Sequence, residues 1–178
     1  MKKYVKYLVA VVLTILVILV GKMSIETSYV NELNENVDVD GLQLLTTVES
    51  NAEQHSNYDE EGGWGGRFFH QMDGDYSIVY SGYPDVMDSY KLTDIHIKSV
   101  KHSVFDITIG SKADAVYTVM NSNGYKKDKH GPSFHGSSQT NYYFTKGKIG
   151  ITFYLKEDNI VESILIRLNS TNKNEVVF

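Results

Sequence analysis

The chain has 178 residues, no cysteine and a formal net charge of −5 at neutral pH. Four lysines and no acid fall in the first 22 residues, so the remainder holds 13 basic and 22 acidic residues, a formal charge of −9. This acidic balance argues against nucleic acid as a partner, because phosphate recognition needs a basic surface. The lack of cysteine excludes disulfides and a lipoprotein anchor, so the fold must depend on its hydrophobic core.

The N-terminus contains the most apolar stretch of the chain. Lys2, Lys3 and Lys6 precede an uncharged run over residues 7–21, which Lys22 closes. As a helix this run covers about 22 Å, against about 30 Å for the hydrocarbon core of a bilayer. Snorkelling lysines and the flanking apolar residues close much of the gap. We therefore predict a signal anchor, a single transmembrane helix, over residues 1–24.

The lysines also predict the orientation of this helix. Three of them lie before the apolar run and one after it, which places the N-terminus in the cytoplasm and the rest of the chain outside the cell membrane. A cleaved secretory signal has a similar beginning. Its cleavage sites would be poor, because Leu19 or Lys22 would occupy a position that prefers a small residue. A buried helix of a soluble protein is the third alternative.

Residues 25–75 are acidic and rich in asparagine. Residues 26–37 and 41–52 each show a short helical pattern. Four glycines then surround Trp64, the only tryptophan, and each glycine costs about 1 kcal/mol in a helix relative to alanine. We expect a mobile loop there. The prediction is an acidic membrane-proximal region over 25–75, partly helical or flexible, followed by an α+β extracytoplasmic domain over 76–178.

The domain begins with alternating patterns that are typical of half-buried strands, over residues 76–80 and 93–98. A helix is expected next, with Ser111 as its N-cap and Gly124 as its left-handed stop. Its apolar face would be formed by residues at helical spacing, namely Ala113, Val116, Tyr117 and Met120.

Three strands at the C-terminus give the clearest pattern: residues 141–145, 149–155 and 161–168, joined by short turns. In the middle strand, apolar side chains alternate with Thr152 and Tyr154, as in a sheet with one face in water. The predicted fold class is therefore α+β: an N-terminal transmembrane helix, then an antiparallel sheet with a three-stranded meander and a helix packed on one face.

The order of elements over about residues 104–169 carries a resemblance. It consists of Ile107-x-Ile109-Gly110, the capped helix, Gly124-Tyr125 and the meander. This order resembles the module of the SmpA/OmlA outer-membrane assembly lipoproteins and the repeat unit of the β-lactamase-inhibitor protein. It is also similar to single modules of small exported proteins of Gram-positive bacteria. The resemblance implies a protein-binding or assembly module and transfers no functional residue, because the matching residues are structural.

Candidate catalytic and metal sites are weak. His130 and His135 have a spacing of interest for zinc but need a further ligand, and Ser133 between them lacks the strand–turn–helix context of a nucleophile. The acids at 59–61 lack the spacing of a calcium loop. We expect no enzyme, no metal and no cofactor. We interpret the histidines as solvated, with His96 pointing to solvent from its strand; the six are His55, His70, His96, His102, His130 and His135.

Recognition is the better-supported role. Trp64 places a large aromatic next to flexible backbone, although it could equally fold back over the sheet edge. Tyr142, Tyr143 and Tyr154 lie in the meander, where tyrosine is also simply a good strand former. We predict a membrane-anchored module that binds another envelope protein through these residues. The alternatives are an immunity-type protein that neutralises a secreted toxin and, less favoured, a small envelope enzyme.

Overall fold

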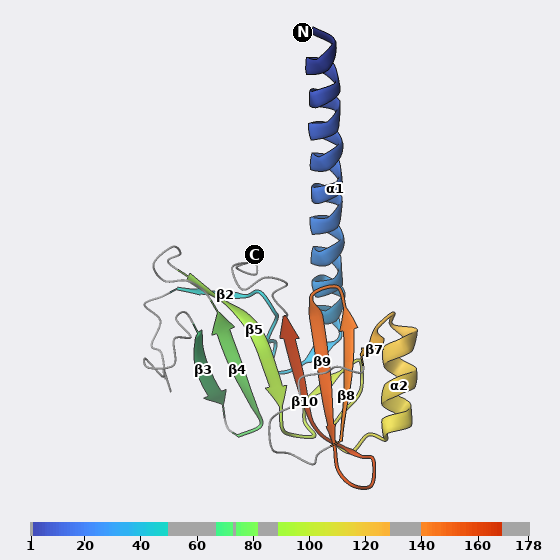
Figure 1. Cartoon of the computed structure of the whole chain (residues 1–178). Helices are drawn as coiled ribbons and strands as arrows, with labels where there is room; N and C mark the ends of the chain where they lie inside the picture. Colours follow the sequence, from blue (N-terminus) through green and yellow to red (C-terminus); the bar gives the residue numbers. More distant parts are fainter. Residues whose placement is uncertain (1, 50–66, 73, 82–88, 129–139, 169–178) are drawn as a thin grey trace.

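The computed structural model describes residues 2–49, 67–72, 74–81, 89–128 and 140–168. The chain forms an antiparallel sheet with a long N-terminal helix rising from one end and a short helix beside the meander (Figure 1). The predicted α+β class is confirmed.

Helix α1 spans Lys2–Glu35, so it continues well beyond the predicted anchor without interruption. Its large apolar side chains from Tyr7 to Ile25 are between 49% and 71% exposed, whereas Val30 is 7% exposed and Leu33 is fully buried. Residues 6–35 make the one helix in the described part that is long and apolar enough to cross a membrane. The same helix therefore offers a lipid-compatible segment and then enters the core of the domain.

The eight strands of the main sheet are all antiparallel to their neighbours. Their order is β3-β4-β5-β10-β9-β8-β7, and β2 pairs with the beginning of β5. A separate two-stranded pair joins β1 and β6. The strands are β1 Val37–Asp38, β2 Thr47–Glu49, β3 Arg67–Met72, β4 Tyr76–Ser81, β5 Ser89–Ile97, β6 Ser103–Val104, β7 Lys126–Asp128, β8 Asn141–Lys146, β9 Ile149–Leu155 and β10 Val161–Leu168.

The predicted meander is confirmed as β8–β9–β10. Strand β10 also pairs with β5, with Ile164 opposite Ile97 and Ile166 opposite Ile95, and this pair joins the early strands to the meander. One face of the sheet is the core face. It carries the fully or almost fully buried side chains of Ile95, Ile97, Phe144, Ile149, Ile151, Phe153, Ile164 and Ile166.

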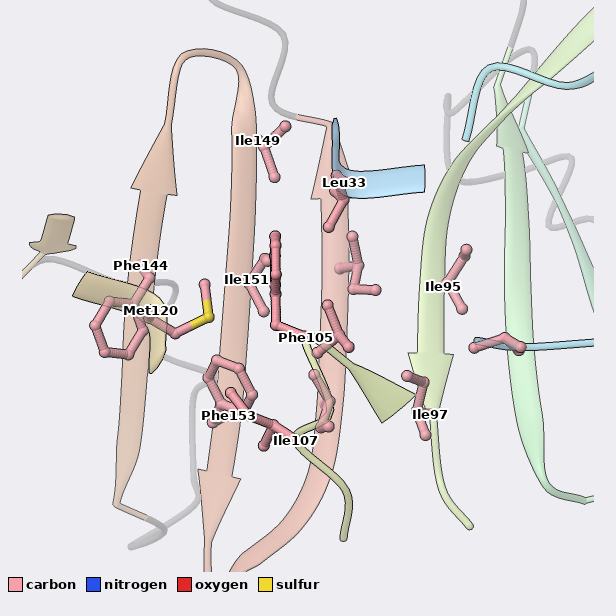
Figure 2. Close-up of a cluster of buried hydrophobic side chains, with 14 of the residues drawn as sticks. Leu33, Ile95, Ile97, Phe105, Ile107, Met120, Phe144, Ile149, Ile151 and Phe153 are labelled. Carbon is pink, nitrogen blue, oxygen red and sulfur yellow. The ribbon is translucent and has the colours of Figure 1, made fainter. Parts of the chain in front are cut away.

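Helix α2, Ala113–Ser122, covers the core face with Ala113, Val116 and Met120, while Tyr117 is 50% exposed. Figure 2 shows Met120 beside Phe144, and Leu33 of α1 near Ile149 and Ile151. The helix ends as predicted, because Gly124 has φ of +77° and supplies the left-handed residue.

The predicted start of α2 is wrong. Lys112 occupies the N-cap position, and no side chain caps the helix there. The Ser111 hydroxyl instead accepts a hydrogen bond from the Thr108 N–H at 3.1 Å, and the Ser111 carbonyl accepts one from the Val161 N–H at 2.9 Å. The connection to β10 thus places Ser111 one residue too early to cap the helix.

The membrane-proximal region contributes to this fold. Val39 and Leu44 lie in the same core as Leu33, and β2 and β3 belong to the main sheet. The helix expected over 41–52 does not form: residues 41–49 contain turns and strand β2. The Asn34 amide holds this segment, since it accepts from the Leu44 N–H at 2.8 Å and donates to the Leu44 carbonyl at 3.1 Å.

Candidate functional site

The three tyrosines predicted to bind a partner do not share one surface. The strand register places Tyr142 opposite Phe153, on the core face, whereas Tyr143 is opposite Thr152 on the other side of the sheet. Tyr154 also lies on that other side, because it alternates with Phe153 along β9. Tyr142 packs against the core, and the Lys127 ammonium lies 3.3 Å from its ring centroid.

We call the side of the sheet opposite the core the polar face, defined by Asp94, His96, Tyr143, Thr152, Tyr154 and Arg167. This face is less exposed to solvent than the sequence pattern predicts: Tyr154 is only 7% and Thr152 only 2% exposed. Burial raises the pKa of the Tyr154 phenol, which therefore stays protonated. Tyr143 and Arg167 remain partly exposed on this face.

A buried carboxylate lies at the centre of the polar face. Asp94 is 3% exposed, and the Arg167 Nε donates to its Oδ1 from the neighbouring strand β10. The Thr93 hydroxyl donates to the other carboxylate oxygen at 2.8 Å. Both oxygens thus have donors, which is what a buried charge requires. The pair fixes the Arg167 guanidinium on the surface with about a third of its side chain exposed.

His96 adjoins this pair, and the expectation that it points to solvent is wrong. Its side chain is half-buried, and its ring lies 6.1 Å from that of Tyr154. Burial, together with the charges of Lys98 and Arg167, lowers the pKa of His96 to about 4. Within the described part of the chain, Nε2 of His96 has no hydrogen-bond partner. The imidazole is therefore neutral at pH 7 and leaves Nε2 as a buried polar atom.

His102 also departs from the prediction of a solvated histidine. It is 4% exposed, and its ring packs edge-on against Tyr76 at 5.2 Å between centroids. Among the described residues, no three His, Asp or Glu side chains gather closely enough to hold a metal ion. Trp64, His130, Ser133 and His135 lie outside the described residues.

A second cluster, which the sequence pattern did not indicate, joins the meander to α1. We call it the helix–hairpin joint: Glu26, Tyr29 and Glu32 of α1 with Lys146, Gly147 and Lys148 at the β8–β9 turn. Lys146 donates to Glu32 at 2.6 and 2.8 Å, and Lys148 lies 3.3 Å from Glu26. A Cβ added at Gly147 would lie 2.9 Å from the Tyr29 ring, so the turn and helix are in direct contact. No local pattern indicated this joint, because Lys146 and its partner Glu32 are 114 positions apart in the chain.

The chain was compared with protein-family models, curated proteins and solved structures, and none of them matches it.

Proposed function

We propose that this protein is a single-pass, membrane-anchored module whose extracytoplasmic domain binds another protein of the cell envelope through the polar face. Its N-terminus lies in the cytoplasm, and α1 is an uncleaved signal anchor. The exposed apolar surface of α1 is the observation that carries the anchoring, since nothing in the described domain covers residues 7–25.

Three features support the anchor and its orientation. Exposed aliphatic side chains over several helical turns are stable in lipid and costly in water. The lysine excess before the apolar run favours a cytoplasmic N-terminus. Helix α1 has no break between residues 2 and 35, so the poor cleavage positions at residues 21–24 lie within continuous helix.

The composition of the polar face supports a binding role. Tyrosine and arginine are the residue types that most often dominate binding energy at interfaces. Arg167 is held in place by Asp94 before any partner arrives, which lowers the ordering cost of its long side chain. The helix-then-meander order is also the arrangement that the SmpA/OmlA resemblance implies, and such modules bind or assemble proteins. Trp64, outside the described residues, stays part of the proposal as a rim of this surface.

Crosslinking in intact cells tests this function. The full-length chain carries a photo-crosslinking residue at Thr145, which is partly exposed on the same side of the sheet as Tyr143. We expect one dominant crosslinked envelope protein, and loss of this product with Tyr143→Ser. The matched control is Tyr117→Ser, because Tyr117 is half exposed on α2, away from the polar face. A product that survives Tyr143→Ser and is lost with Tyr117→Ser would contradict the assignment.

A further inference from the structure

The helix–hairpin joint lies very close to the end of the apolar run of α1. Figure 1 shows α1 leaving the sheet at the end where β8 and β9 are joined, while the β9–β10 turn lies at the opposite end. The Lys148 ammonium is 3.3 Å from Glu26, and Glu26 is only four residues beyond Lys22. Four residues of helix rise about 6 Å.

This distance is comparable with the thickness of a lipid headgroup layer. A bilayer is about 40–45 Å thick with its headgroups and about 30 Å without them, which leaves about 5–8 Å on each side. If the hydrocarbon ends near Lys22, the pair of Lys148 and Glu26 lies at the depth of the headgroups. The joint keeps the β8–β9 turn against α1, because Lys146 also binds Glu32 of this helix.

Hydrophobic mismatch also favours a position of the domain close to the membrane surface. The uncharged run over residues 7–21 is about 8 Å shorter than the hydrocarbon core it must cross. Met23 and Ile25 follow Lys22 and are 68% and 53% exposed, so their apolar side chains are free to enter lipid. Their burial lowers the β8–β9 turn towards the membrane surface.

We propose that the β8–β9 turn rests on the outer headgroup layer, with Lys22 and Lys148 next to lipid phosphates. This inference depends on the proposed anchoring of α1. It restricts the partner of the polar face, because the strands of the meander extend only about 23 Å from that turn, at about 3.3 Å per residue. A partner of the polar face therefore binds within this distance of the membrane surface.

Depth-dependent fluorescence quenching tests the inference. The chain contains no cysteine, so a single NBD fluorophore can be attached at Lys148→Cys, and at Asp158→Cys in the β9–β10 turn as the matched distal site. The full-length proteins are reconstituted in phosphatidylcholine–phosphatidylglycerol vesicles that contain lipids with a nitroxide on the headgroup. We expect several-fold stronger quenching at position 148 than at position 158. Equal quenching at the two sites overturns the proposal.

A lengthened helix provides an independent check. Four alanines inserted after Gly21 extend the apolar run by about 6 Å and remove most of the mismatch. The turn should then lie farther from the headgroups, and quenching at position 148 should fall towards that at position 158. Unchanged quenching at 148 would contradict the role of mismatch. Flotation with the vesicles separates the two proposals: a protein that does not float overturns the anchoring as well, whereas a floating protein with equal quenching overturns only the contact with headgroups.

Discussion

The Lys146 ammonium donates to both carboxylate oxygens of Glu32, at 2.6 and 2.8 Å, across 114 positions of the chain. Only 14% of the Lys146 side chain is exposed, and its third hydrogen bond goes to the Asn123 carbonyl at the C-cap of α2, at 3.0 Å. One lysine thus connects α1, the meander and α2. The neighbouring Tyr125 is 1% exposed; burial, with a smaller effect of Glu32, raises the pKa of its phenol.

Replacement of Lys146 by methionine should destabilise the fold strongly. It leaves the Asn123 carbonyl and Glu32, whose side chain is 40% exposed, without their donor, and loss of one partner of a partly buried charged hydrogen bond costs about 1–2 kcal/mol. The measurement is urea unfolding of the full-length protein in detergent micelles. Lys101→Met is the control, because the Lys101 side chain is 70% exposed in its pair with Asp75 and should contribute little. Equal losses from the two variants would contradict the special role of Lys146.

Gly147→Ala should be more harmful than Gly74→Ala. Both glycines have positive φ, +58° and +77°, so alanine costs about 1–2 kcal/mol of backbone strain at either position. Only at Gly147 would the new methyl group meet another side chain, the Tyr29 ring at 2.9 Å. We expect the free energy of unfolding to fall by about a further 1–2 kcal/mol there. Thermal unfolding should then give a lower midpoint for Gly147→Ala than for Gly74→Ala. The contact between α1 and the turn would be disproved if the two variants melted together.

His96 should make the protein sensitive to mild acid. Its folded pKa of about 4 lies below the ordinary value of 6.5, so between these values the unfolded chain binds a proton that the folded chain does not. Stability therefore falls as the pH is lowered from about 6.5 towards 4, by about 1 kcal/mol at pH 5 after allowance for partial exposure. His96→Gln should remove this part of the slope in urea unfolding at pH 5 and pH 7. An unchanged slope in the variant would exclude His96 as its source.

Lys112→Ser should stabilise the domain. Lys112 is exposed and already has the extended backbone of an N-cap, with φ of −75° and ψ of 144°, but its side chain makes no capping hydrogen bond. A serine hydroxyl there can accept from the N–H of the second or third residue of the helix, a gain of about 0.5–1 kcal/mol. Lys112→Ala separates this effect from the mere removal of a cation near a helix N-terminus. If serine and alanine give the same thermal midpoint, capping is not the cause.

The strands and the end of α2 could be predicted because their signals are local. Alternation along β9 assigned Ile149, Ile151 and Phe153 to the core face, and Gly124 marked the helix end. The exposure of the opposite face could not be read in the same way. Alternation says that His96 and Tyr154 point away from the core, but their burial depends on neighbours in adjacent strands.

The helix–hairpin joint could not be predicted from the sequence, because its contacts join residues that are far apart in the chain. Nothing near Lys146 in the chain indicates Glu32 as its partner. The helical pattern predicted over residues 26–37 is largely confirmed by α1, which ends at Glu35, but that pattern does not indicate that the stretch continues the anchor helix into the core. Tyr142 is a similar case. A register shift of one residue would exchange the faces of Tyr142 and Tyr143, and only the pairing with Phe153 and Thr152 decides between them.

The most direct test of the central proposal is cysteine accessibility in spheroplasts. Single cysteines are introduced at Lys3 and at Asp158 of the otherwise cysteine-free chain and treated with a membrane-impermeant maleimide. A signal anchor with its domain outside predicts that Asp158→Cys is labelled at once and remains in the membrane fraction, while Lys3→Cys is labelled only after permeabilisation. Labelling of Lys3→Cys in intact spheroplasts, with Asp158→Cys protected, would contradict the orientation. Release of the labelled Asp158→Cys domain into the medium would contradict the anchor.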